Sequence, residues 1–124
     1  MGNMGKEHPV LSDEDVQRRL SAELPRWSLA GGCLERVYRT SGWRASLMVA
    51  NTIGHLAEAA WHHPDVEVTW GKVWVKLRTH NAGGITEKDF ALAKQIEQVT
   101  LWRPGEDSLL DGTPNKWVRG GSKE

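Results

Sequence analysis

Three of the five histidines in this chain flank a stretch that predicts a β-hairpin. His62 and His63 end a helical pattern just before Pro64, and His80 follows the last residue of the second strand. The open end of an antiparallel hairpin brings the residues before its first strand close to those after its second. Imidazoles exchange protons near neutral pH, so we expect a cluster that both donates and accepts protons, with Glu58 one turn before His62.

Two other interpretations of these side chains stay open. A single histidine at a helix end commonly hydrogen-bonds a carbonyl group and has no further role. His55, Glu58 and His62 are spaced i, i+3 and i+7 on one helical face and could present metal ligands, although this is not the His-Glu-x-x-His pattern. Cys33 has no thiolate partner, and we expect no metal.

The elements that must position the histidines follow from the apolar periodicity. Steps of three and four residues predict helices, and alternating residues predict strands. The chain is expected to form an α+β domain, in which a four-stranded antiparallel sheet carries three helices on one face in two layers. The predicted order is α-β-β-α-β-β-α, with helices over 12–24, 43–61 and 86–99 and strands over 27–29, 34–40, 66–70 and 73–77.

Turn and cap residues mark the ends of these elements. Gly31-Gly32 predicts one hairpin turn, and Gly71-Lys72 predicts a second, of type II′. Ser12 precedes three acidic residues and is expected to cap the first helix. Thr86 and Asp89, three apart, predict a capping box for the last helix.

The chain of 124 residues divides into three predicted parts. Residues 1–10 lack periodicity and are expected to be a flexible arm, residues 11–100 form the domain, and residues 101–124 form an extended C-terminal tail. Two of the seven tryptophans, Trp102 and Trp117, lie in that tail. We expect them either to pin the tail to its own domain or to contact another protein.

Composition excludes several classes of protein. Sixteen basic and sixteen acidic residues give zero formal net charge, which argues against a partner that is a nucleic acid or an anionic membrane surface. The longest weakly polar stretch, 46–61, contains Asn51, His55 and Glu58, so no membrane span is expected. The lone Cys33 and a polar N-terminus predict a cytoplasmic location.

A spaced set of these residues resembles the signature of the pterin-4a-carbinolamine dehydratase family. It comprises Glu58-x-x-x-His62-His63-Pro64, then Trp70, then Thr79-His80, then Gly83-Gly84-Ile85-Thr86-Glu87-Lys88-Asp89-Phe90. The resemblance implies dehydration of 4a-hydroxytetrahydropterin to quinonoid dihydropterin, in recycling of the pterin cofactor of aromatic amino-acid hydroxylases. The pterin is then the substrate, and the resemblance implies no cofactor and no metal.

The resemblance also implies roles for individual residues. His62 and His63 are the acid candidates and His80 the base candidate, although the match does not fix these roles. The substrate-binding residues implied by the resemblance are Glu58, Pro64, Asp65, Trp70, Thr79 and Asp89. A homodimer or homotetramer is expected, because the edge strands of a four-stranded sheet invite pairing.

Departures from the family pattern keep a second function open. Asn81 stands where the family commonly has an acid, Trp61 is bulky at the rim of the expected site, and the chain after about residue 100 has no role in the chemistry. Some dehydratase-like proteins bind other proteins, and a bacterial branch resembles a RuBisCO assembly factor of α-carboxysomes. The alternative is therefore a catalytically silent bacterial factor that contacts a client protein through its Trp-rich tail.

Overall fold

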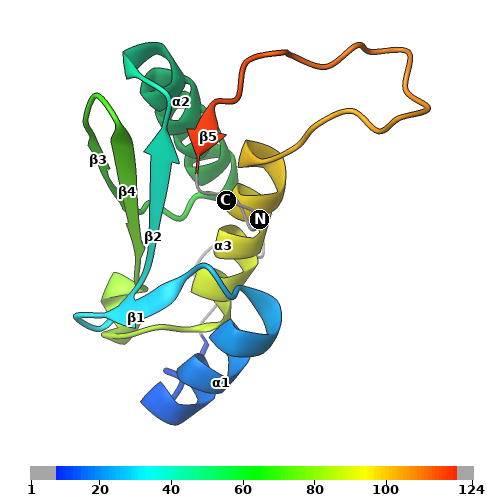
Figure 1. The fold of residues 1–124 in the computed structure, drawn as a ribbon. Helices are drawn as coiled ribbons and strands as arrows, with labels where there is room; N and C mark the ends of the chain where they lie inside the picture. Colours follow the sequence, from blue (N-terminus) through cyan, green and yellow to red (C-terminus); the bar gives the residue numbers. More distant parts are fainter. Residues whose placement is uncertain (1–7, 120–124) are drawn as a thin grey trace.

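The computed structural model describes residues 8–119, in which helices and antiparallel strands form two layers (Figure 1). The expected order of the seven main elements is confirmed, and the α+β prediction with it. Within these residues no helix is long and apolar enough to cross a membrane. The first seven residues of the predicted N-terminal arm and the last five of the tail lie outside the described range. The elements are α1 (Asp13–Glu23), β1 (Ser28–Ala30), β2 (Cys33–Thr40), α2 (Trp43–Ala60), β3 (Asp65–Val68), β4 (Lys72–Leu77), a short 3-10 helix (His80–Ala82), α3 (Glu87–Thr100) and β5 (Val118–Arg119).

The helices begin where the sequence predicts. The Ser12 hydroxyl accepts a hydrogen bond from the backbone N–H of Asp15 at the start of α1. Thr86 and Asp89 form the predicted capping box of α3, in which each side chain bonds the backbone near the other. Polar side chains close in sequence therefore cap two of the three helix starts.

The sheet has the strand order β1-β2-β4-β3, and every neighbouring pair is antiparallel. Alternate residues of β2 and β4 are buried against the helices, among them Leu34, Tyr38 and Val75. Ile53 of α2 and Phe90 of α3 belong to the same core cluster. The helices thus cover one face of the sheet, and the histidine-bearing ends of α2 and β4 are carried on this rigid layer.

A fifth strand extends the predicted four-stranded sheet. β5 lies in the tail and pairs with the end of β2, where Arg39 faces Arg119 and Thr40 faces Val118. This position is open because β1 is only three residues long and pairs with residues 33–35 of β2 alone. A two-residue strand carries too little pattern to be recognised in a sequence.

The hairpin turns agree with the prediction in one case and differ in the other. Gly31 and Gly32 both have positive φ, at 58° and 76°, and connect β1 to β2 as expected. The predicted type II′ turn at Gly71-Lys72 is wrong, because Gly71 has no positive φ and Lys72 already belongs to β4. Thr69 closes the turn instead, through its backbone N–H to the Lys72 carbonyl and its hydroxyl to the same residue.

A polar network ties α3 to the sheet. The Glu97 carboxylate on α3 accepts hydrogen bonds from the Arg36 guanidinium at 2.9 Å, the Tyr38 hydroxyl at 2.7 Å and the Trp27 indole at 2.9 Å. Burial opposes ionisation of Glu97, but the bonds and charge of Arg36, with the bonds from Tyr38 and Trp27, outweigh it, so its pKa lies below the usual value. Burial also raises the pKa of Tyr38, so its hydroxyl stays a donor.

Stability is expected to fall on acidification because of two glutamates. The pKa of Glu97 is lowered, and hydrogen bonds from Arg19 and Lys94 lower that of Glu23 from 4.5 to about 2. A depressed native pKa stabilises the fold above the unfolded value and loses that contribution as pH falls through the native value. Thermal unfolding scans should show a constant midpoint above about pH 5 and a decline between about pH 5 and 2.

A Glu97→Gln variant serves as the control for this acid effect. The variant loses the charged bond to Arg36, so its unfolding midpoint should be lower at neutral pH. Because a carboxamide does not titrate, that midpoint should also change less with acid than the midpoint of the natural protein. Parallel pH profiles for the two proteins would contradict the assignment to Glu97.

Candidate active site

A buried carboxylate at the start of α3 organises the site. Asp89 has no exposed surface, and its Oδ2 accepts hydrogen bonds from the Thr79 hydroxyl at 2.8 Å and the Thr86 backbone N–H at 2.9 Å. The Thr86 hydroxyl completes the cluster with a 2.8 Å bond to that of Thr79. The capping box thus links the last helix to the segment that follows β4.

His62 binds the second oxygen of the same carboxylate. Its Nε2 lies 2.7 Å from Asp89 Oδ1, and its side chain is only 15% exposed. An ionised carboxylate can only accept hydrogen bonds, so the hydrogen is assigned to Nε2 of the imidazole. Nδ1 is left with a free lone pair in the neutral ring.

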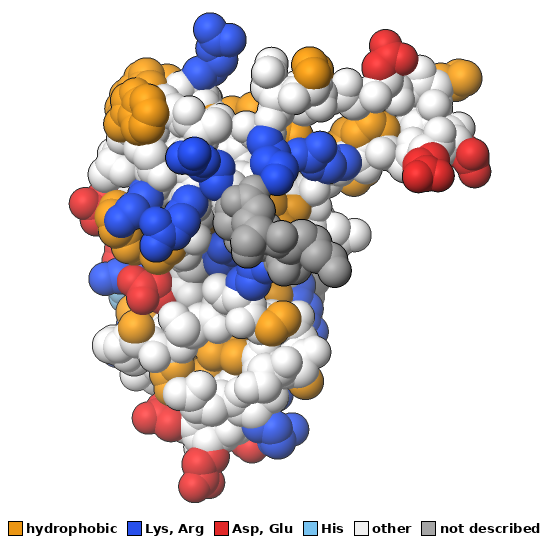
Figure 2. Space-filling view, viewed as in Figure 1, with side chains coloured by type: hydrophobic (Ala, Val, Ile, Leu, Met, Phe, Trp, Pro, Cys, Tyr) orange, Lys and Arg blue, Asp and Glu red, His pale blue; other side chains and the backbone are white. Residues whose placement is uncertain are grey.

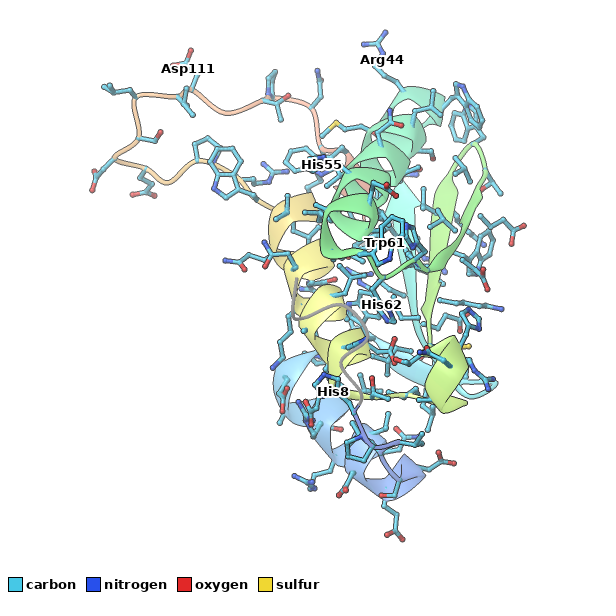
Figure 3. All side chains as sticks on the ribbon, turned by 180° about the vertical axis from the view of Figure 1, so that it is seen from behind. His8, Arg44, His55, Trp61, His62 and Asp111 are labelled. Carbon is cyan, nitrogen blue, oxygen red and sulfur yellow. The ribbon has the colours of Figure 1, made fainter. Side chains whose placement is uncertain are left out.

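The end of α2 turns His62 toward Asp89. Trp61 adopts the left-handed conformation, with φ 57° and ψ 45°, and is the one non-glycine residue of the described chain with positive φ. Its N–H bonds the Glu58 carbonyl and that of His62 bonds the Ala57 carbonyl, the pairing of a Schellman motif. Figure 3 shows Trp61 and His62 just past the end of α2. Strain in a bulky residue is thus held beside the histidines, as is common at functional sites.

His63 occupies a more open position than His62. Its Nε2 lies 2.9 Å from Glu58 Oε1, and the two side chains are 52% and 71% exposed. The Trp61 ring packs edge-on against the His63 ring, with 5.1 Å between centroids. Glu58 therefore orients His63, although it stands one turn before His62 in the sequence.

His80 begins the short 3-10 helix directly after Thr79 and is exposed. Thr79 is tied to Asp89 by its hydroxyl and to Gly84 by its backbone N–H, so both ends of the loop 79–84 are fixed. The ring of His80 makes no hydrogen bond to any of residues 8–119. Thus His62 and His80 are both attached to one buried carboxylate, the first directly and the second through the neighbouring residue.

Of the remaining predicted site residues, Pro64 and Asp65 lie next to the histidines and Trp70 does not. Pro64 and Asp65 follow His63, and Asp65 is the first residue of β3, one position earlier than expected. Trp70 lies in the turn at the closed end of the β3–β4 hairpin, 66% exposed, whereas the histidines lie at the open end. Within a single described chain Trp70 therefore does not join the other predicted site residues.

The alternative metal site is not formed by its three proposed ligands. His62 bonds Asp89 and Glu58 bonds His63, while His55 lies further up α2 (Figure 3). Among residues 8–119 no group of three or more histidine, cysteine or carboxylate side chains gathers around a common point. The helical face that carries His55, Glu58 and His62 is therefore divided between two separate histidine–carboxylate pairs and an exposed histidine.

Sequence reasoning missed one member of the site. Thr86 was expected only to cap a helix, yet its N–H and hydroxyl support the carboxylate that holds His62. The position of Thr86, three residues before Asp89, predicts a capping box, but this pattern indicates only where the helix begins. One carboxylate thus performs two tasks, as helix cap and as partner of a histidine.

The arrangement is chemically suited to acid–base work. A protonated His62 places its positive charge against the buried Asp89 carboxylate and keeps an N–H at Nδ1 to give away. The neutral ring accepts a proton at the same atom. His63 follows His62 in the chain, and His80 follows Thr79, which bonds the same carboxylate, so further imidazoles are available for general acid–base catalysis.

Comparisons with known proteins agree on one family. Residues 9–99 match the model of the family described as pterin 4 alpha carbinolamine dehydratase. A relative from Aquifex aeolicus, provisionally named pterin-4-alpha-carbinolamine dehydratase, is 47% identical over 89 residues, which cover 72% of this chain and 89% of the relative. A relative of the same provisional name from Chloroflexus aurantiacus is 41% identical over 91 residues, covering 73% and 97%.

A solved structure shares the fold. The crystal structure of a transcriptional coactivator/pterin dehydratase from Brucella melitensis superposes with a TM-score of 0.65 and 22% sequence identity. The match covers 71% of this chain and 95% of that one. The family match ends at residue 99, so the segment after α3 lies beyond it.

Proposed function

The chain belongs to the pterin 4 alpha carbinolamine dehydratase family, and on that premise we propose that it dehydrates a 4a-hydroxytetrahydropterin by histidine acid–base catalysis. The observation that carries the proposal is the 2.7 Å bond between His62 and the buried Asp89, within the family's own residue signature. A carboxylate with no exposed surface that holds one tautomer of a histidine is an arrangement for moving protons.

The reaction needs one proton given and one taken. The C4a–O bond breaks as the hydroxyl leaves as water, the N5–H proton is removed, and its electrons form the C4a=N5 double bond of the quinonoid product. His62, with its charge supported by Asp89, donates from Nδ1 to the leaving hydroxyl. His80, whose ring is unbonded within residues 8–119, takes the N5 proton, and His63 is the second candidate for the acid.

Two substitutions test this assignment. His62→Ala and His80→Ala should each lower the rate of carbinolamine dehydration at least about tenfold, because each removes one proton-transfer group. His80 is exposed, so its removal should change the unfolding temperature little. Removal of His62 leaves Asp89 Oδ1 without its partner and should lower the unfolding temperature, which is recorded beside the rate. The rate is measured by following the absorbance of freshly generated 4a-hydroxytetrahydropterin in a stopped-flow instrument.

His55→Ala is the matched control, since His55 is an exposed histidine on α2 that does not contact Asp89 or His63. Its rate should equal that of the natural protein. Equal rates for all three variants would contradict the proposal.

A protein-binding function is the second candidate, and one observation favours it. The segment 102–116 lies beyond the family match and projects from the domain, with Trp102 57% exposed and Leu109 fully exposed. Trp117 is half-buried and its indole bonds the Thr100 carbonyl, so this tryptophan pins the tail. A client such as RuBisCO would therefore meet Trp102 and the leucines. A catalytically silent protein that binds a client would show no rate above the uncatalysed reaction.

A further inference from the structure

The segment 102–116, here called the arm, stands away from its own domain. It leaves the end of α3, loops outward and returns to the sheet at β5 (Figure 1). Its ends are fixed by the 2.8 Å bond from the Trp117 indole to Thr100, by the Arg103 guanidinium over the Trp117 ring and by the pairing of β5 with β2. A groove of about 610 Å³ separates it from Met48 of α2 and Val99 of α3. The arm is therefore anchored at both ends and projects from the domain between them.

The arm presents leucines among carboxylates. Leu109 is 101% exposed and Leu110 61% exposed. Two neighbouring leucines therefore present their apolar side chains to water. Residues 104–115 contain Glu106, Asp107 and Asp111 and no lysine or arginine. None of these three carboxylates forms an ion pair within residues 8–119. The arm thus combines an unpaired acidic charge with an uncovered apolar contact.

A complementary surface lies where α2 begins beside the β3–β4 turn. Trp43 is 50% exposed and Trp70 66% exposed, and the Trp70 ring packs against Gly42, the residue before Trp43. Arg44 is exposed next to them, and Arg39 faces Arg119 across the β2–β5 pair. In the described chain these three arginines form no ion pair. This surface, here called the tip, comprises Arg39, Trp43, Arg44, Trp70 and Arg119.

The arm and the tip of one chain do not meet. Figure 2 shows acidic side chains at the outer end of the projecting arm and lysines and arginines gathered on the body. In Figure 3 Asp111 and Arg44 lie well apart, one on the arm and the other at the beginning of α2. Within residues 8–119 no side chain pairs with the carboxylates of the arm, and a second molecule can supply that partner.

We propose that the arm docks on the tip of a second copy of this chain. The chain itself supplies both halves of the contact: leucines for the exposed tryptophans, and three unpaired carboxylates for three unpaired arginines. A two-fold axis makes such a contact reciprocal and closed, so that two arms cover two tips. The acidic arm and the basic tip are then opposite patches that neutralise each other on assembly. This inference does not depend on the proposed function.

Leu109→Asp tests the docking directly. The side chain is fully exposed, so the substitution does not disturb the isolated fold. The natural protein at about 0.1 mM should sediment as a dimer or larger assembly, and the variant should dissociate with a Kd at least about tenfold higher. Ser108→Asp, which adds the same charge next to Leu109 without removing an apolar side chain, should leave the Kd unchanged or lower it.

Charge reversal locates the partner surface. Replacing Glu106, Asp107 and Asp111 by lysine, or Arg39 and Arg44 by glutamate, should each weaken assembly, and mixing the two variants should restore it. A natural protein that is monomeric at 0.1 mM would overturn the proposal. So would a Leu109→Asp protein with unchanged assembly, or a failure of the mixed variants to recover.

Discussion

Asparagine in place of Asp89 is expected to lower the rate of carbinolamine dehydration by about 10²- to 10⁴-fold. The amide oxygen can still accept the N–H of Thr86, so the start of α3 is kept. The amide nitrogen, however, faces His62 Nε2 and donates to it, which moves the imidazole hydrogen to Nδ1. The ring then no longer offers Nδ1 as an acceptor, and a protonated ring has lost its counter-charge.

The readout must distinguish this positioning role from simple damage to the fold. Nitrogen-15 NMR of His62 should show a hydrogen on Nε2 in the natural protein and on Nδ1 in the Asp89→Asn variant, with thermal unfolding recorded beside it. Glu58→Gln makes the same change in the exposed His63 pair and should cost less than about tenfold. A full rate in Asp89→Asn, or an unchanged tautomer, would contradict the role given to Asp89.

Removing Glu97 is expected to cause a large loss of stability. Glu97→Ala leaves the Arg36 guanidinium, the Tyr38 hydroxyl and the Trp27 indole without their common acceptor, and the first two belong to buried residues of β2. Breaking a buried ion pair by removing one partner costs about 3–5 kcal/mol. The free energy of unfolding, measured by urea denaturation, should fall by this amount.

Arg18→Ala is the control for that loss. Arg18 pairs with Asp15 on the surface of α1, with side chains 70% and 51% exposed, and its removal should leave stability nearly unchanged. Comparable losses in the two variants would show that the Glu97 network contributes no more than a surface pair.

Most of the fold could be predicted because local signals and periodicity agreed. Ser12 and the Thr86–Asp89 pair marked two helix starts, and Gly31-Gly32 marked a turn that requires positive φ at both positions. The alternating residues of β4 indicated which side chains face the helices. Each of these signals acts over a few residues, so the sequence alone carries it.

The parts that were missed depend on contacts between distant segments. β5 forms because β1 leaves the end of β2 unpaired, which no local pattern records. The left-handed Trp61 stands where glycine is usual, so the turn that aims His62 had no glycine to mark it. Trp70 was grouped with the histidines by family resemblance, but the length of the hairpin separates them within one chain.

The site shows the same limit in a different form. The approach of His62 to the open end of the hairpin was predicted, and Asp89 was expected to cap α3. That Asp89 also binds His62 follows only once α3 packs beside the end of α2. A residue with a complete local explanation can still hold a second role that the tertiary structure adds.

The most direct test of the account is the rate at which the natural protein removes freshly generated 4a-hydroxytetrahydropterin near pH 7.5, compared with the same solution without protein. The account predicts a rate that rises in proportion to protein concentration and exceeds the uncatalysed rate at least about 10²-fold, the contribution of a single positioned proton-transfer group. A rate equal to that of the protein-free solution would contradict the central claim and would favour a protein-binding function for the chain.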